Sequence, residues 1–252
     1  MFSAILNRVG IKGTYVPFMV EPDQLGHAVQ SLKVLNIAGA NVTVPYKEKV
    51  MPHLDAVSEG ATIIGAVNTI VRNGSRLKGY NTNAIGFMDA LNQAGFDVSG
   101  KSALVFGAGG AAKAVVFILN WLRAESILVA GRNEEKVEGI VNHIGGEGKS
   151  LESLWDEHIS ANIVVNATSA SSPDESPDLA ALAAQLELSD CELMFDLNYG
   201  RRENFWQDMA RSRGIQFMDG LPALAYQARR TFSLWTGLQV PPEEFLRALE
   251  SA

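Results

Sequence analysis

The sequence predicts an α/β fold whose second part is a doubly wound parallel sheet. Between residues 101 and 220, apolar segments suited to buried strands alternate with helical patterns, which is typical of a parallel sheet covered by helices on both faces. The first apolar segment leads into a glycine-rich turn, GAGGAA at residues 107–112, and the turn leads into a helical pattern. Strand, glycine turn and helix in this order indicate a dinucleotide-binding fold.

The residues before 101 predict shorter elements. Apolar spacing predicts helices over residues 2–9, 22–36, 46–55 and 82–94, and strands over 14–20 and 37–45. Two further strands, 66–72 and 76–82, flank Asn73-Gly74, a dipeptide that favours a tight hairpin turn.

The residues after 101 predict the sheet and its covering helices. The expected strands are 102–107, 126–131, 162–168, 193–199 and 215–220, and the clearest helices are 112–122, 134–144 and the C-terminal segments 225–237 and 241–249. The Ser/Pro-rich segment 169–178 is expected to be a mobile loop.

Composition and charge argue against several classes of function. The 252 residues carry a formal net charge of −7, which argues against binding to nucleic acid or to an anionic membrane surface. Cys191 is the only cysteine, so an internal disulfide is excluded. The four histidines do not share a metal-ligand spacing with cysteines or acidic residues, so no metal is predicted; they are His27, His53, His143 and His158.

The sequence shows no targeting or membrane segment. The first residues lack the basic stretch and apolar core of a signal peptide, and no apolar run approaches the roughly 20 residues that span a bilayer. We therefore expect a cytoplasmic protein.

The glycine turn is expected to bind the pyrophosphate of a dinucleotide. Gly107 permits the tight turn, Gly109 lets the backbone approach the phosphates, and the small Ala112 lets helix and strand pack closely. The helix that follows presents unpaired N–H groups and a partial positive charge. The expected cofactor contacts in this turn are Gly107, Ala108, Gly109, Gly110 and Ala111.

The second strand of this part favours NADP over NAD. In NAD-binding folds a carboxylate at the end of this strand binds the ribose 2′-hydroxyl. Here the strand ends at Gly131, followed by Arg132, Asn133 and Lys136, so two cations can reach a 2′-phosphate. The alternative is that Arg132 is only a solvated charge at the start of a helix.

Lys47 is a candidate for proton transfer. It follows Pro45 in the first turn of a predicted helix, where the positive end of the helix favours its neutral form. A neutral lysine can accept a proton near neutral pH. Taken alone, a lysine in this setting is usually a surface charge.

An ordered set of motifs resembles the shikimate dehydrogenase family. The motifs are NVTVPYKE (41–48), AVNT (66–69), GYNTNAIGF (79–87), GAGGAA (107–112), NAT (166–168), DGLPALAYQA (219–228) and LWTG (234–237). They occur in the order and spacing of that family, from the first helix to the C-terminus. The resemblance implies an NADP-dependent oxidoreductase that interconverts shikimate and 3-dehydroshikimate by hydride transfer at a ring hydroxyl, in aromatic amino-acid biosynthesis.

The resemblance also implies two domains and a set of site residues. The substrate domain comprises residues 1–82 and 224–252, and the NADP-binding domain comprises residues 83–223. The implied catalytic residues are Lys47 and Asn83. The implied ring-hydroxyl ligands are Thr43, Asn68 and Gln227, with Tyr199 near the substrate carboxylate and Thr168, Leu197 and Gly220 beside the cofactor.

The sequence departs from the family pattern at two places. Asn83 stands where the family has aspartate, and an amide keeps the shape but loses the charge that holds the lysine, so the pKa of Lys47 is expected to be lower. Asn83 is alternatively only a helix N-cap. The family opens with a strand and a His-Ser-x-Ser-Pro loop whose serines bind the substrate carboxylate, and this segment does not precede the helix at residues 2–9. Its lack is expected to leave neighbouring backbone groups unpaired.

Three functions remain open at this point. The first is a shikimate dehydrogenase, and the second is a dehydrogenase for quinate or another polyol. The third is a catalytically silent NADP-binding relative, which Asn83 and the lack of the two serines favour, whereas Lys47, Asn68 and Gln227 oppose it. The expected partner is a small-molecule ring acid, and the chain is expected to be a monomer or a homodimer.

Overall fold

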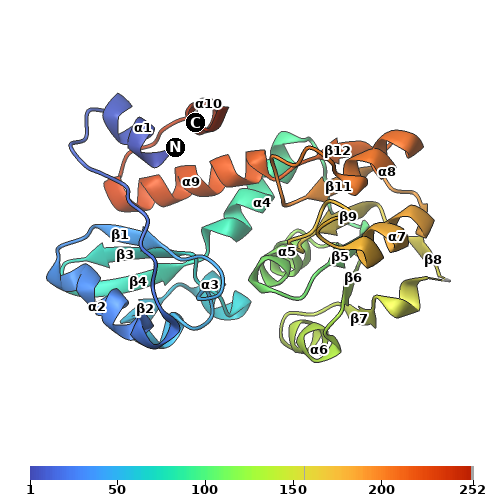
Figure 1. Ribbon diagram of the computed structural model, residues 1–252, viewed down its shortest axis with the longest axis horizontal. Helices are drawn as coiled ribbons and strands as arrows, with labels where there is room; N and C mark the ends of the chain where they lie inside the picture. The colour runs from blue at the N-terminus through green and yellow to red at the C-terminus, as the bar shows by residue number, and fades with distance from the viewer. Residues whose placement is uncertain (156, 251–252) are drawn as a thin grey trace. The chain divides into compact units, whose positions relative to one another are not determined.

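The computed structural model describes residues 1–155 and 157–250, and it contains two compact units (Figure 1). The first unit comprises Met1–Asp89 and the segment from Pro222 onwards, and the second comprises Ala90–Leu221. The first change of unit falls inside the helix α4 (Thr82–Gln93), and the second lies at the start of α9 (Leu221–Thr236).

A four-stranded sheet forms the centre of the first unit. Its strand order is β1-β3-β4-β2, with β1 (Gly39–Asn41), β2 (Ala56–Val57), β3 (Thr69–Asn73) and β4 (Arg76–Tyr80). β3 and β4 form the predicted antiparallel hairpin, with Gly74 at a φ of +62° in its turn. The buried side chains of Ile70 and Leu77 pack with apolar residues of α2 (Leu25–Val34).

The remaining helices of this unit form a second apolar core. α1 (Phe2–Arg8), α9 and α10 (Pro242–Glu250) pack together around Phe2, Phe232 and Phe245. α3 (Glu59–Ile64) and the 3-10 helices η1 (Pro22–Gln24) and η2 (Met51–His53) complete the unit.

Two elements predicted in this unit are not formed. Residues 14–20 make no strand, because no described strand pairs with them, and Phe18 and Met19 are exposed. The predicted helix over residues 46–55 is replaced by turns and by η2. Pro52 explains this second difference, since proline lacks an N–H donor and disfavours helical backbone at the preceding residue.

The second unit contains the predicted parallel sheet. Its order is β12-β11-β9-β5-β6-β7, and every neighbouring pair is parallel. The strands are β5 (Ser102–Phe106), β6 (Ser126–Gly131), β7 (Glu147–Ser150), β9 (Ile163–Asn166), β11 (Leu193–Asp196) and β12 (Gln216–Met218). The α/β fold with a doubly wound sheet is therefore confirmed.

Helices cover this sheet and a small strand pair lies beside it. The helices are α5 (Gly110–Trp121), α6 (Glu134–His143), η3 (Glu152–Leu154), α7 (Pro177–Gln185) and α8 (Phe205–Arg213). β8 (His158–Ser160) pairs with β10 (Glu187–Ser189). The short strands β2, β7, β8 and β10 were not predicted, because two to four residues of mixed polarity carry no clear alternation.

Residues 169–176 form a loop, as expected, but its first half is anchored in the second unit, and α7 begins at Pro177. Ser171 is fully buried, and its Oγ donates to Asp196 Oδ2 at 2.6 Å. The backbone N–H of Ser171 donates to Glu175 Oε2 at 2.8 Å. Buried hydrogen bonds of this kind fix the backbone where the composition alone suggests mobility.

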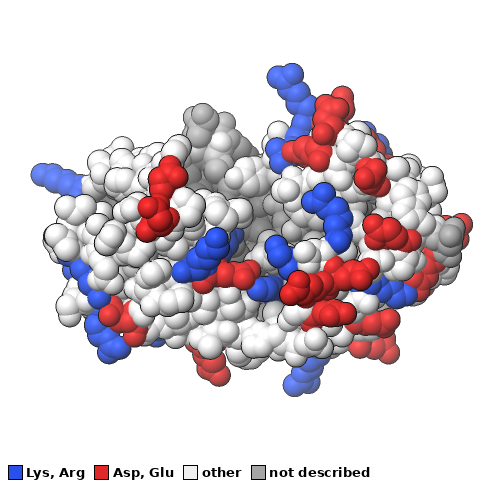
Figure 2. Space-filling view, turned by 60° about the horizontal axis from the view of Figure 1, so that its bottom comes forward, with Lys and Arg blue, Asp and Glu red and all other residues white. Residues whose placement is uncertain are grey.

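Two surface properties bear on partners. On the face shown in Figure 2, Lys and Arg side chains are interspersed with Asp and Glu, and they do not merge into one basic patch. Within the described residues, no helix is both long enough and apolar enough to cross a membrane.

Candidate active site

The strand order of the second unit reverses between β5 and β9. From β5 the sheet runs outward through β6 and β7, and from β9 it runs the other way through β11 and β12 (Figure 1). The loops that leave the carboxyl ends of β5 and β9 therefore diverge, which opens a ligand-binding crevice in doubly wound sheets. The GAGGAA turn follows β5, and Thr168 follows β9.

Close backbone approaches shape the glycine turn. Gly107 has a φ of +120°, and a Cβ at this position would lie 2.8 Å from the backbone oxygen of Ala167. Gly109 has nothing within 4 Å of a Cβ position, and it precedes α5 without a side-chain cap. The first N–H groups of α5 have no partner within the helix, so this turn suits a phosphate anion.

The residues after β6 suit a second phosphate. A Cβ on Gly131 would lie 3.4 Å from Ala108 Cβ, which places this strand end beside the glycine turn. Arg132 and Lys136 are exposed, and neither forms an ion pair with a described residue. Asn133 caps α6, because its Oδ1 accepts from Lys136 N at 2.9 Å. These cations and the glycine turn fit a dinucleotide that carries a 2′-phosphate.

The other predicted cofactor residues lie in loops at the same edge of the sheet. Thr168 Oγ1 donates to Asn166 Oδ1 at 2.7 Å, so this hydroxyl is already used inside its own turn. Gly220 contacts Leu197 so closely that a Cβ would lie 2.1 Å from the Leu197 oxygen. Tyr199 is exposed in the loop after β11.

Sequence reasoning missed a buried carboxylate behind these loops. Asp196 ends β11 with 1% of its surface exposed. It accepts from Ser171 Oγ at 2.6 Å, Asn204 Nδ2 at 2.7 Å and Asn166 Nδ2 at 2.8 Å, and both the backbone N–H and Nδ2 of Asn198 also donate to it. The sequence signal that could have revealed it is an aspartate at the end of an apolar strand. Asp196 fixes the loops that carry Thr168, Leu197 and Tyr199.

In the first unit, Asn68 is the centre of a polar cluster. Its Nδ2 lies 2.9 Å from each of three oxygens: Thr82 Oγ1, Asn83 Oδ1 and Gln227 Oε1. Its Oδ1 accepts from the backbone N–H of Thr82 at 2.6 Å. The structure thus brings together three predicted site residues, Asn68, Asn83 and Gln227, from β3, α4 and α9.

Three buried threonine hydroxyl groups, which the sequence did not reveal, hold this cluster in place. Thr69, Thr82 and Thr231 are buried, and their Oγ1 atoms lie 3.0 to 3.1 Å from one another. Asn41 Nδ2 joins them by donating to Thr69 Oγ1 at 3.2 Å. Such a satisfied buried network holds its members in one arrangement.

A glycine allows the two helices of the cluster to touch. A Cβ on Gly86 of α4 would lie 2.4 Å from the Ala223 oxygen and 2.8 Å from Gln227 Cβ. The absence of a side chain at Gly86 therefore lets α9 approach α4 until Gln227 reaches Asn68. Arg229 and Asp89, 3.4 Å apart, add an ion pair between the same helices.

Asn83 is not the cap of α4. Asn81 has this role, because its Oδ1 accepts from Ala84 N at 3.1 Å and its Nδ2 donates to the Ala66 oxygen. Asn83 lies in the first turn of the helix and points its oxygen to Asn68. The capping explanation for Asn83 is therefore wrong.

Lys47 lies in a turn beside the cluster. Its backbone oxygen accepts from Val67 N at 2.7 Å, and Val42 N donates to the Asn68 oxygen at 2.8 Å, so residues 42–47 flank Asn68. Burial lowers the pKa of Lys47, and no described residue forms an ion pair with it. The expected helix start is not formed at this residue, so desolvation replaces the helix end as the cause of the lowered pKa. Thr43 is exposed in the same segment.

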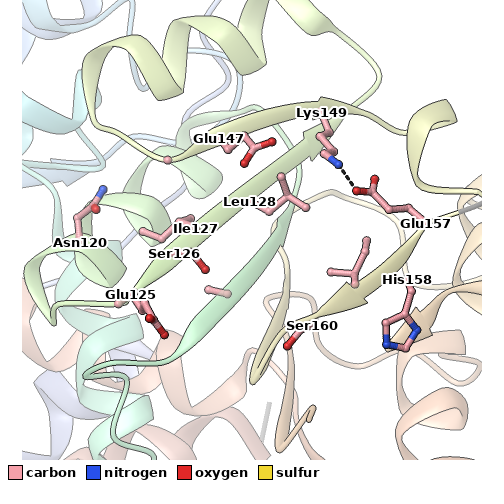
Figure 3. Close-up of a pocket in the computed structure, with 14 residues that line it drawn as sticks. Asn120, Glu125, Ser126, Ile127, Leu128, Glu147, Lys149, Glu157, His158 and Ser160 are labelled. Atoms are coloured by element: carbon pink, nitrogen blue, oxygen red, sulfur yellow. Dashed lines mark hydrogen bonds and ion pairs between the residues drawn. The ribbon is translucent and has the colours of Figure 1, made fainter. Parts of the chain in front are cut away.

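A cavity of about 480 Å³ in the second unit lies elsewhere (Figure 3). It opens towards the amino ends of β5, β6 and β7, and its lining includes Glu125, Ser126, Lys149 and His158. No predicted site residue lines it. Among the described residues, no three His, Cys, Asp or Glu side chains are grouped as metal ligands.

Comparisons with known proteins agree with this arrangement. Residues 1–70 match the model of the shikimate dehydrogenase substrate binding domain, and residues 90–202 match that of shikimate / quinate 5-dehydrogenase. A shikimate dehydrogenase (NADP(+)) of Desulforamulus reducens is 40% identical over 250 residues, which cover 96% of this chain and 86% of the relative.

Solved structures give the same result. A shikimate dehydrogenase from Aquifex aeolicus has a TM-score of 0.87 and 33% identity, with 98% of this chain and 90% of that chain covered. A shikimate 5-dehydrogenase from Thermus thermophilus in complex with NADP(H) and shikimate has a TM-score of 0.85 and 32% identity, with 99% and 92% covered. The chain therefore belongs to the shikimate dehydrogenase family.

Proposed function

We propose that the protein is an NADP-dependent oxidoreductase that interconverts shikimate and 3-dehydroshikimate. The observation that carries the proposal is the Asn68 cluster, which brings Asn83 and Gln227 together beside a partly buried lysine, Lys47. The names of the relatives supply the substrate and the cofactor. The reaction belongs to the biosynthesis of aromatic amino acids.

The first unit provides the groups for a polyhydroxylated ring. Thr43 and Gln227 bind its hydroxyls, because amide and hydroxyl groups pair with the alcohols that they desolvate. Asn68, the third predicted ligand, is buried and already hydrogen-bonded inside the cluster, so its role is to orient Asn83 and Gln227. Tyr199 has an exposed phenol, and the resemblance to the family is what assigns it to the substrate carboxylate.

Lys47 exchanges the hydroxyl proton. Its lowered pKa increases the neutral fraction near neutral pH, and the neutral amine can take a proton from an alcohol. In the reverse direction the ammonium returns this proton to the oxygen. Asn83 contacts the same oxygen.

The second unit holds NADP. The backbone of residues 107–111 holds the pyrophosphate, and Arg132 and Lys136 neutralise the 2′-phosphate. Gly131 and the amide of Asn133 lie beside them, and Thr168, Leu197 and Gly220 are the residues that would line the nicotinamide side of the site. When bound, NADP accepts or returns the hydride.

Asn83 also favours a second candidate function. Because an amide replaces the family's carboxylate, the preferred alcohol can differ from shikimate, and quinate or another cyclic polyol is the alternative. A silent NADP-binding relative is the remaining possibility, and it would bind NADPH without turning over any of these alcohols.

Absorbance at 340 nm tests the proposal. Purified protein is given NADP with shikimate or with quinate, and NAD replaces NADP as the control. We expect NADP reduction with shikimate and little with NAD. Reduction with quinate alone would establish the second candidate, and NADPH binding without turnover of either acid would contradict both.

A further inference from the structure

A backbone N–H group fixes which atom of the Asn68 side-chain amide accepts a hydrogen bond and which one donates. The Thr82 N–H can only donate, and it lies 2.6 Å from Asn68 Oδ1. The oxygen of the Asn68 amide must therefore face Thr82 N, which places its NH₂ group on the other side. This NH₂ group faces the oxygens of Thr82, Asn83 and Gln227, each at 2.9 Å.

The orientation of the Asn68 amide determines the orientation of the two neighbouring side-chain amides. Asn83 and Gln227 both turn their oxygens towards Asn68, because only an acceptor can face its NH₂ group. Their own NH₂ groups therefore point away from Asn68. Neither of these nitrogens has an acceptor among the described residues, and both side chains are partly exposed.

The accessible side of the Asn68 cluster therefore presents mainly hydrogen-bond donors. The amide nitrogens of Asn83 and Gln227 can only donate. Among the described residues of the cluster and its flanking segment, Lys47 is the one that can take up a proton near neutral pH, since amides and hydroxyls do not do so. A carboxylate at position 83 would instead present an acceptor.

We propose that Asn83 Nδ2 and Gln227 Nε2 donate hydrogen bonds to substrate oxygens, so that the site recognises the reacting oxygen as an acceptor. The inference rests on the proposed function for the identity of the substrate. A ketone oxygen only accepts and matches Asn83 fully. A hydroxyl also accepts from Asn83, but its own proton needs a second acceptor, and neutral Lys47 is the group proposed for it.

The chemistry of the step is complete with these groups. In oxidation, the O–H bond breaks and its proton moves to neutral Lys47 Nζ, while the C–H bond breaks and bound NADP would supply the acceptor for the hydride and its electron pair. The C=O bond forms, and Asn83 Nδ2 stays hydrogen-bonded to the same oxygen throughout.

Hydrogen exchange of the side-chain amides tests the orientation without a substrate. NMR signals of the ligand-free protein are assigned by their loss in N83D and Q227E. We expect the NH₂ groups of Asn83 and Gln227 to exchange with solvent at least tenfold faster than that of Asn68. Equal protection of all three would overturn the orientation, whatever the substrate is.

Calorimetric binding of 3-dehydroshikimate and shikimate tests the consequence. In Asn83→Asp the carboxylate faces the ketone oxygen, so the affinity for the ketone relative to the alcohol should fall about tenfold, the order expected when two acceptors replace one hydrogen bond. Asn92→Asp, the same amide-to-carboxylate change at an exposed position of α4, is the matched control and should leave this ratio within about twofold. An unchanged ratio in Asn83→Asp would overturn the inference.

Failure of the native protein to bind either ligand would instead contradict the proposed function, and the exchange experiment still decides the orientation.

Discussion

The two candidate binding regions are built by different means. In the second unit, the glycine turn after β5 is shaped by backbone, and its residues are neighbours in sequence. In the first unit, the Asn68 cluster is made by side chains, and Asn68 and Gln227 are 159 residues apart in sequence. The backbone site offers N–H groups and space to an anion, whereas the side-chain site offers directed hydrogen bonds. In the function that we propose, charge and shape select the cofactor, and hydrogen-bond direction selects the substrate.

Replacing Lys47, beside the Asn68 cluster, should have the largest effect on kcat/KM. Lys47→Met should lower kcat/KM for shikimate about 10²- to 10⁴-fold, the usual contribution of a general base. The Kd for NADPH should stay within twofold, because its predicted ligands are in the second unit. Steady-state rates and fluorescence titration measure the two quantities. A loss of less than tenfold in kcat/KM would show that another group takes the proton.

Two glycine variants distinguish the effect of backbone shape on stability from the effect of phosphate contact on cofactor binding in the glycine turn. Gly107→Ala should lower the free energy of unfolding by about 1–3 kcal/mol, because alanine at a φ of +120° is strained and its Cβ meets Ala167. Gly109→Ala has free space and no positive φ, so its stability should stay native while its Kd for NADPH rises about tenfold, or ~1.4 kcal/mol. Chemical denaturation and titration distinguish the two. If Gly109→Ala binds NADPH normally, the phosphates do not approach this turn.

Arg132 should affect the binding of one cofactor only, so its replacement sharpens the choice between NADP and NAD. Arg132→Gln should raise the Kd for NADPH about tenfold by removing one charge-assisted hydrogen bond to the 2′-phosphate. Binding of NADH, which lacks this phosphate, should not change. Equal losses for both cofactors would place Arg132 away from the 2′-phosphate.

The same contrast explains what the sequence could predict. The strand, glycine turn and helix around residues 102–121 are specified by local patterns, and the structure confirms them. The resemblance placed Asn68, Asn83 and Gln227 in one site, but it did not reveal Thr69, Thr231 or Gly86. Those residues act through contacts between segments far apart in sequence, which local periodicity does not encode.

The failures of prediction have physical causes as well. The helix expected at Lys47 is interrupted at Pro52, and residues 14–20 have the composition of a strand but no described neighbour to pair with. The segment 169–178 has the composition of a mobile loop, yet Asp196 anchors it through Ser171. For residues 14–20 and 169–178 the hydrogen-bond partners decide the outcome, and they are set by the tertiary structure, whereas Pro52 acts locally.

The pH dependence of kcat/KM for shikimate oxidation tests the account most directly. Burial lowers the pKa of Lys47, and only the neutral amine takes a proton. The rate should therefore rise with pH through a pKa below the ordinary lysine value of about 10.4. In Asn83→Asp a carboxylate favours the ammonium form, so the pKa of Lys47 should increase and the rise should move to higher pH. A rise at the same pH in both proteins would contradict the role of Lys47 as the proton acceptor beside Asn83.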